Sequence, residues 1–190
     1  MRFGCLYVPE LPWQAFLRVE PSLEGQAVAV ARGEGARAEV VAVSPPARAR
    51  GVRPGARLKE ALALCPELIL RWEEPAVQEA AREAAVDAAA AVAPKVEEVR
   101  PGLLVVDTQG LEKLHGGDRG LGSALLTAAR RLGLSGRAGV ASGKRIAQIA
   151  ALRSEGIEVV PKGEERSFLA PLPLTALGAA PHLVETLTRW

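Results

Sequence analysis

Proline and glycine residues divide this chain of 190 residues into short segments, and these breaks limit what it can fold into. Pro9 ends a first apolar run, Pro45 and Pro46 end a Val-rich run, and Pro66 and Pro94 each close a helical stretch. Proline lacks an N–H and disfavours a helical residue before it, so regular elements end at these positions. The chain is expected to mix short strands and helices, and it shows no internal repeat or low-complexity linker.

The segments between the breaks predict a mixed sheet protein. Strands are expected at 2–8, 27–31, 39–43, 68–72, 95–100, 103–107, 137–141 and 157–160. Helices are expected at 13–19, 57–65, 76–92, 120–132 and 144–153, with two short ones around Gly178 and Pro181. Strands and helices that mix without strict βαβ repetition favour an α/β or α+β fold with helices on one face of the sheet.

The charge of the chain limits which binding partners are expected. The net charge is +2 with a pI near 8.7, whereas a dedicated nucleic-acid binder usually carries a stronger basic excess. The densest basic group comprises Arg48, Arg50, Arg53, Arg57 and Lys59, which indicates a solvated face or a contact to nucleic acid or an acidic partner.

The sequence also predicts a cytoplasmic protein without a membrane anchor. Cys5 and Cys65 lack the spacing of a metal site or a disulfide framework, which fits a reducing cytosol. No secretory signal is visible, and no apolar stretch reaches the ~18 residues of a membrane span. His115 and His182 are the chain's two histidines, so a histidine metal cluster or a nucleophilic triad is not expected.

Four sequence motifs occur in a fixed order. They are PSLEGQAVAV at 21–30, SPPARARGVRPG at 44–55 followed by EALALCPEL at 60–68, LVVDTQG at 104–110, and GVASGKRIAQIA at 139–150, which leads to FLAPLP at 168–173. Together they resemble the N-terminal part of Y-family translesion DNA polymerases, of the UmuC/DinB/ImpB-MucB-SamB type. One motif alone would be weak evidence for this resemblance, whereas four motifs in this order are a specific signal.

The resemblance implies an α+β fold. A polymerase palm with a ferredoxin-like mixed sheet is expected at 1–9 and 73–162, and a small fingers subdomain at 10–72. Residues 163–190 are expected to begin a helical thumb that is truncated in this chain.

The positions that hold the family's metal-binding carboxylates carry other residues here. The resemblance places Tyr7 at the first aspartate, and Gly102 and Leu103 at the Asp-Glu pair. Polymerases need carboxylates that hold two divalent ions, so no metal, cofactor or catalytic residue is expected. Asp107 matches a family aspartate downstream of the ligands and is interpreted as a strand-end or capping acid.

Arg48 is the expected remnant of the family's triphosphate site. Pro45 replaces its tyrosine partner, and Glu155 stands where a triphosphate-binding lysine is expected. Lys144 and Arg145 open the helix at 144–153, with Ser142 as a candidate N-cap, and they are candidates for DNA phosphate contacts or solvated surface charges.

The pattern resembles the catalytically inactive ImuB-like subgroup. This implies an accessory or scaffold role in DNA damage tolerance, together with a damage-response polymerase and a RecA-like partner. DNA binding is expected to be weak, and a sliding-clamp contact requires a longer chain. Two alternatives stay open: a weakly active polymerase using Asp107 and Glu10, and a protein-interaction domain without a DNA role, which the near-neutral charge favours.

Overall fold

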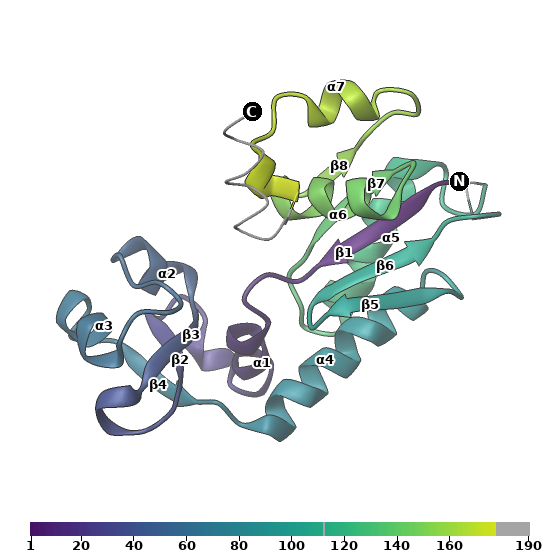
Figure 1. Cartoon of the computed structure of the whole chain (residues 1–190). Coiled ribbons are helices and arrows are strands. Elements are labelled where there is room, and N and C mark those ends of the chain that lie inside the picture. Colours follow the sequence, from purple (N-terminus) through teal and green to yellow (C-terminus); the bar gives the residue numbers. More distant parts are fainter. Residues whose placement is uncertain (112, 178–190) are drawn as a thin grey trace. The chain divides into compact units, whose positions relative to one another are not determined.

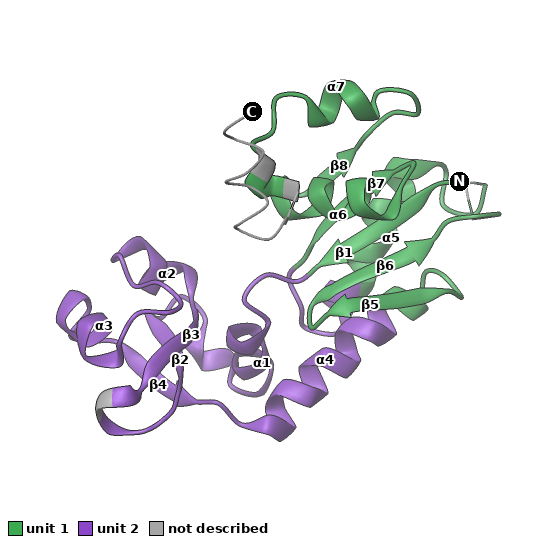
Figure 2. Cartoon of the chain, viewed as in Figure 1, with its two compact units in different colours: residues 1–7, 89–128, 136–190 green, residues 8–88, 129–135 purple. Residues whose placement is uncertain are grey.

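The computed structural model describes residues 1–111 and 113–177, whose chain forms two compact units (Figures 1 and 2). The first unit comprises Met1–Tyr7, Ala89–Ala128 and Gly136–Trp190, and the second comprises Val8–Ala88 and Ala129–Ser135. Each unit has its own sheet and its own buried apolar residues. Within the described residues, no helix is long and apolar enough to cross a membrane.

The first unit contains a five-stranded mixed sheet in the order β5-β6-β1-β7-β8. Its strands are β1 (Phe3–Tyr7), β5 (Val96–Arg100), β6 (Leu103–Asp107), β7 (Arg137–Ala141) and β8 (Ile157–Val159). β7 and β8 run parallel, and the other neighbours pair antiparallel. The sheet therefore combines both pairing modes, as expected from the sequence.

The strand register places β1 at the centre of this sheet. Tyr7 lies opposite Leu103 on one side and opposite Arg137 on the other. At the other end of β1, Phe3 lies opposite Asp107 and Ala141. Tyr7 and Asp107 are therefore at opposite ends of the sheet.

Helices cover both faces of the five-stranded sheet. A Cβ added at Gly4 would meet the side chain of Leu121 in α5 (Asp118–Arg131) at 3.0 Å. Cys5 and Leu103, on the other face, pack against Ala147 and other small residues of α6 (Lys144–Arg153). Successive strand residues point to opposite faces, so α5 and α6 lie on different sides. The expectation of helices on one face was wrong, because the alternate residues on both sides are apolar.

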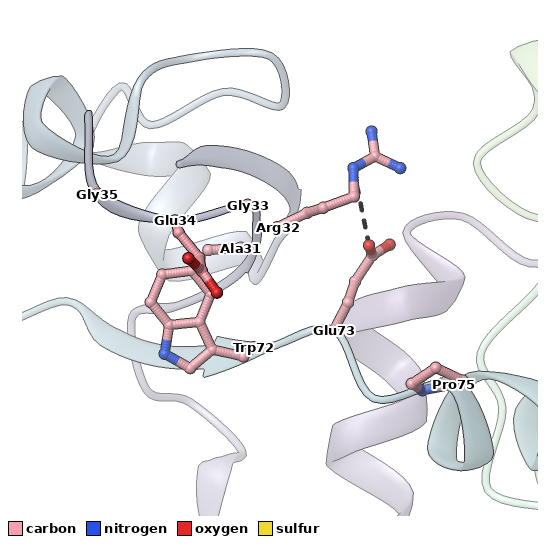
Figure 3. Close-up of a pocket in the computed structure, with 8 residues that line it drawn as sticks. All are labelled: Ala31, Arg32, Gly33, Glu34, Gly35, Trp72, Glu73 and Pro75. Carbon is pink, nitrogen blue, oxygen red and sulfur yellow. Dashed lines mark ion pairs between the residues drawn. The ribbon is translucent and has the colours of Figure 1, made fainter. Parts of the chain in front are cut away.

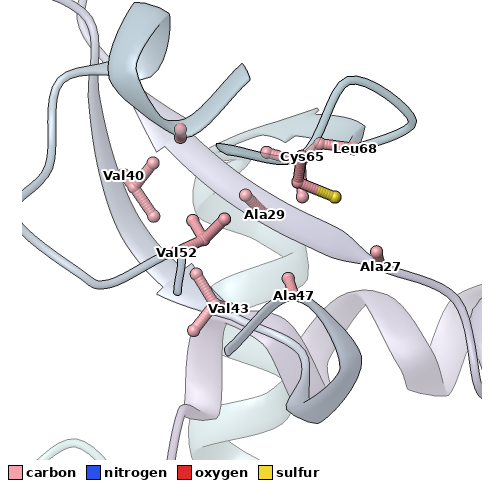
Figure 4. Packing of buried hydrophobic residues seen from close by; sticks show 9 residues of the cluster. Ala27, Ala29, Val40, Val43, Ala47, Val52, Cys65 and Leu68 are labelled. Carbon is pink, nitrogen blue, oxygen red and sulfur yellow. The ribbon is translucent and has the colours of Figure 1, made fainter. Parts of the chain in front are cut away.

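The second unit contains a three-stranded sheet in the order β3-β2-β4, also apolar on both faces. Its elements are α1 (Leu11–Val19), η1 (Pro21–Leu23), β2 (Val28–Arg32), η2 (Gly35–Arg37), β3 (Glu39–Val43), α2 (Pro45–Ala49), α3 (Leu58–Leu64) and β4 (Ile69–Trp72). Ala29 belongs to a cluster with Val52 and Cys65 (Figure 4), whereas Val28 packs with Trp13 of α1.

Helix α4 (Pro75–Ala90) runs from the second unit into the first, since the units divide at Ala88 and Ala89. After β8, the described chain ends in α7 (Glu165–Leu169) and η3 (Leu174–Leu177). The helices predicted around Gly178 and Pro181 lie outside the described residues.

Candidate functional site

The three positions expected to have lost metal ligands lie together at one end of the five-stranded sheet. Tyr7 ends β1 directly opposite Leu103, the first residue of β6. Gly102 precedes Leu103 in the turn between β5 and β6, with a φ of 76°. Leu103 is 2% exposed, so its side chain belongs to the core of the unit. Phenol, glycine and leucine provide no carboxylate oxygen at this end of the sheet.

An arginine occupies the space beside Tyr7. The guanidinium of Arg100, the last residue of β5, lies 5.7 Å from the centre of the Tyr7 ring, within the range of a cation–π interaction. The register brings Arg100 opposite Leu103 after an irregularity that follows Glu98. This part of the sheet therefore carries a fixed positive charge.

The buried thiol next to this site is chemically quiet. Cys5 is 0% exposed in the core below Tyr7. Burial raises the pKa of the Cys5 thiol to about 12, and the charge of Arg100 lowers it only in part. A thiol of this kind stays protonated at neutral pH and is neither a metal ligand nor a nucleophile.

Asp107 lies at the far end of β6 and has local partners. It is four residues from Leu103, which corresponds to about 13 Å along a strand. Its carboxylate accepts a hydrogen bond from the backbone N–H of Gln109 at 3.0 Å and lies 3.6 Å from Lys95 Nζ. This geometry is that of an acid that closes the strand end, as the sequence suggested. Within the described residues, no three His, Cys, Asp or Glu side chains are grouped so as to hold a metal ion.

Arg48 lies in the second unit and is paired with Glu10. Arg48 belongs to the short helix α2, and its guanidinium forms an ion pair with the Glu10 carboxylate. The second oxygen of Glu10 accepts a hydrogen bond from the Val43 N–H at 2.9 Å. The acid therefore joins the end of β3 to α2. The side chain of Arg48 is 44% exposed.

The beginning of α6 differs from the expectation in one respect. Gly143 is the N-cap residue, with no side-chain cap, and the Ser142 hydroxyl instead accepts a hydrogen bond from Arg2 at 3.0 Å. The predicted cap at Ser142 was wrong, because this hydroxyl joins the N-terminal strand to the loop before α6. Lys144 pairs with Glu97 and lies 5.8 Å from the Phe3 ring centre, and Arg145 donates to Gln148 at 2.8 Å.

A pocket in the second unit contains none of the predicted site residues (Figure 3). It encloses about 630 Å³ beside Trp72, which is 50% exposed. Glu34 and Glu73 line it, and Arg32 lies 3.8 Å from the Glu73 carboxylate. Two acids against one paired arginine make this wall unfavourable for a phosphate.

Sequence reasoning did not single out Arg100 and Arg137. Both flank the positions expected to have lost metal ligands, because Arg137 lies opposite Tyr7 and Arg100 opposite Leu103. The sequence does place both arginines at strand ends, because Arg100 ends one predicted strand and Arg137 begins another. Their closeness depends on the pairing of strands that are far apart in the sequence, which the local pattern does not give.

Comparison with known proteins gives a consistent picture. A family model described as the impB/mucB/samB family matches residues 6–152. DNA polymerase IV 2 of Mesorhizobium japonicum is 34% identical over 162 residues, which cover 84% of this chain and 38% of that protein. Protein ImuB of Caulobacter vibrioides is 32% identical over 127 residues, which cover 67% of this chain and 28% of that protein. The chain thus spans well under half the length of these curated relatives.

Solved structures share the fold. The chain matches the crystal structure of DinB from Sulfolobus solfataricus with a TM-score of 0.84 at 20% identity, over 100% of this chain and 57% of that one. An insertion ternary complex of Dbh DNA polymerase matches with a TM-score of 0.86 at 19% identity, with the same coverage. The predicted fold class, an α+β polymerase palm with a mixed sheet and a small fingers part, is confirmed by this likeness.

Proposed function

The chain belongs to the impB/mucB/samB family, and from this premise we propose that it is a non-catalytic homologue of Y-family DNA polymerases. Its role is that of an accessory or scaffold factor in DNA damage tolerance and translesion synthesis. The polymerase relatives supply the link to DNA, and the similarity to Protein ImuB of Caulobacter vibrioides supplies the link to damage tolerance.

The observation that carries the proposal is the composition of the sheet end at Tyr7. Phosphoryl transfer by two metal ions requires anionic oxygen ligands that hold the ions a few ångströms apart. Tyr7, Gly102 and Leu103 provide none, and Arg100 lies over the Tyr7 ring. A guanidinium at this place repels a divalent cation, so the site is unsuited to metal binding both in its ligands and in its charge.

The alternative, a weakly active polymerase, relies on Asp107 and Glu10. Several relatives are named DNA polymerase IV, which favours this alternative. Against it, Asp107 interacts with Lys95 and the Gln109 N–H, and Glu10 pairs with Arg48 and the Val43 N–H. Each carboxylate would have to give up these partners before it could bind a metal.

The partners follow from the same role and are part of the proposal. They are a damage-response polymerase and a RecA-like protein, with DNA bound weakly. A sliding-clamp contact is proposed only for a longer chain. In this proposal Arg48 is a remnant of the family's nucleotide-binding site, and its observed contact is the ion pair with Glu10.

Primer extension tests the absence of catalysis. Purified protein is incubated with a primed template, all four dNTPs and either Mg²⁺ or Mn²⁺, next to an active Y-family polymerase as the positive control. We expect no extended primer at any protein concentration. Extension that disappears in an Asp107→Ala variant would refute the proposal and establish the active alternative.

A further inference from the structure

Two arginines, a tyrosine and a leucine form a row across four neighbouring strands at the Tyr7 end of the sheet. The row comprises Arg100 of β5, Leu103 of β6, Tyr7 of β1 and Arg137 of β7, which lie opposite one another in the register. We call these four residues the basic row. Leu103 is buried, Tyr7 and Arg137 are half-buried, and Arg100 is exposed.

The four side chains share one face of the sheet. Directly paired residues of antiparallel strands point to the same side, and the contact between Arg100 and the Tyr7 ring agrees with this. Tyr7 and Leu103 belong to the cluster packed against α6, which identifies the face. Both guanidinium groups therefore lie on the side of the sheet to which the family's lost carboxylates would belong.

The two arginines have no ion-pair partner within the part of the chain that the structure describes. Neither forms an ion pair with an acid there. Glu97, further along the same face of β5, is paired with Lys144. Glu98 lies opposite Leu104 and so points to the other face. Glu155 is exposed, just before β8, and is not paired with Arg137.

We propose that the basic row binds the phosphodiester backbone of DNA directly, without a metal ion. The inference rests on the proposed function and adds the site by which this unit holds DNA. An arginine is charged at every physiological pH, and its planar fork donates two parallel hydrogen bonds to a phosphate. Arg100 and Arg137 are separated by three strand spacings, about 14 Å between backbones. They therefore contact two different phosphates.

This arrangement replaces a metal-mediated contact by a permanent one. A polymerase that holds DNA through a divalent ion loses that contact in a chelator. A guanidinium keeps its contact to DNA in a chelator, and unlike a metal ion it offers no open coordination position for chemistry. A contact through arginines in place of a metal ion fits a protein that holds DNA without extending a primer.

The salt dependence of DNA binding tests the proposal. The affinity of the wild-type chain for a primed duplex is measured in EDTA between 50 and 200 mM salt by fluorescence anisotropy. Each neutralised duplex phosphate contributes about 0.9 to the slope of log K against log salt, so R100A/R137A should lower that slope by about 1.8. R100K/R137K should keep most of the slope, because the charges remain.

Arg119 provides a matched control. It is an exposed arginine in the first turn of α5, next to Asp118, which pairs with Arg2 near the other end of β1. R119A should leave both the affinity and the slope unchanged. Circular dichroism and thermal melting confirm that the variants fold, which is expected because Arg100 is exposed and Arg137 is half-buried.

The outcomes separate this inference from the proposed function. A double variant with wild-type affinity and slope overturns the basic row as a DNA site, whatever the result of primer extension. If polyglutamate but not DNA requires the two arginines, the row serves an acidic protein segment and the proposal is wrong. Wild-type protein that binds no DNA at low salt overturns the proposal and favours the protein-interaction alternative. Primer extension by wild-type protein would refute the non-catalytic role separately.

Discussion

Gly139 marks a place where two backbones approach more closely than any side chain allows. A Cβ at this position would lie 2.2 Å from the Ala147 oxygen and 2.4 Å from the Ala151 nitrogen. Both atoms belong to the backbone of α6, which packs on β7 here and cannot move aside as a flexible side chain can. The glycine therefore determines how α6 seats on the sheet.

A Gly139→Ala substitution should destabilise the protein strongly. Overpacking of a core costs about 1–3 kcal/mol, and we expect the upper end because the clashing atoms are backbone. Urea unfolding followed by circular dichroism gives the change in the free energy of unfolding. Gly156→Ala is the matched control, because nothing lies within 4 Å of its added Cβ. Equal stability of the two variants would show that α6 can shift away from β7.

Single residues were predicted from the sequence with mixed success. The strand-end interpretation of Asp107 is consistent with its contacts to Lys95 and to the Gln109 N–H, because an acid after an apolar strand acts locally. Ser142 was misassigned, since its hydroxyl accepts a hydrogen bond from Arg2, which is distant in the sequence. Local roles can be inferred from local sequence, whereas partners supplied by folding cannot.

At the scale of elements, α2 shows how a proline pair can begin a helix. Ser44 is its N-cap, and Pro45 and Pro46 fill the first two helical positions, where a missing N–H costs little. The buried Ser44 hydroxyl accepts from the Val28 N–H at 2.9 Å and donates to the Gln26 oxygen at 2.8 Å. One side chain thus caps α2 and joins it to the beginning of β2.

A Ser44→Ala substitution should therefore cost more than an ordinary cap. Loss of the cap and of the partner for two buried backbone groups adds to about 2–4 kcal/mol. Thermal and urea unfolding measure the effect. Ser123→Ala, on an exposed position of α5, should change stability by less than about 0.5 kcal/mol. A small effect at Ser44 would mean that water replaces the hydroxyl.

Most other elements follow from their apolar runs and breaks. The strands at Leu103–Asp107 and Arg137–Ala141 and the helix at Lys144–Arg153 begin and end where the sequence predicts. Helix α2 was missed because Pro45 and Pro46 were interpreted only as the end of a strand. Strand order was not predicted, because the pairing of Tyr7 with both Leu103 and Arg137 connects residues about a hundred positions apart.

At the scale of the whole molecule, chain continuity and compact units do not coincide. Each unit is assembled from separate segments, and the chain passes between them after Tyr7, Ala88, Ala128 and Ser135. The palm and fingers ranges expected from the family resemblance divide the chain after residues 9 and 72 instead, and they stay a prediction. Helix α4 accounts for most of the difference, because all but its last two residues belong to the second unit.

Thermal unfolding with and without divalent ions gives a whole-molecule prediction. A ligand that binds only the folded chain stabilises it by RT ln(1 + [L]/Kd), which is about 1.4 kcal/mol at tenfold excess over Kd. Within the described residues no acidic cluster can hold a metal, and Arg100 adds a repulsive charge at Tyr7. We therefore expect the same Tm in EDTA and in 10 mM Mg²⁺ or Mn²⁺.

A rise in Tm with Mn²⁺ would contradict this expectation, and one variant then identifies the responsible acid. If the rise disappears in Asp107→Ala, a metal binds at the far end of β6, close to Lys95 and away from Tyr7. Such a site lies four residues from Leu103 along the strand, about 13 Å. An acid at this distance from the Tyr7 end cannot share a pair of metal ions with it, because the two ions of such a site lie ~3.5–4 Å apart. Metal binding there would thus stabilise the fold without placing an ion at the Tyr7 end of the sheet.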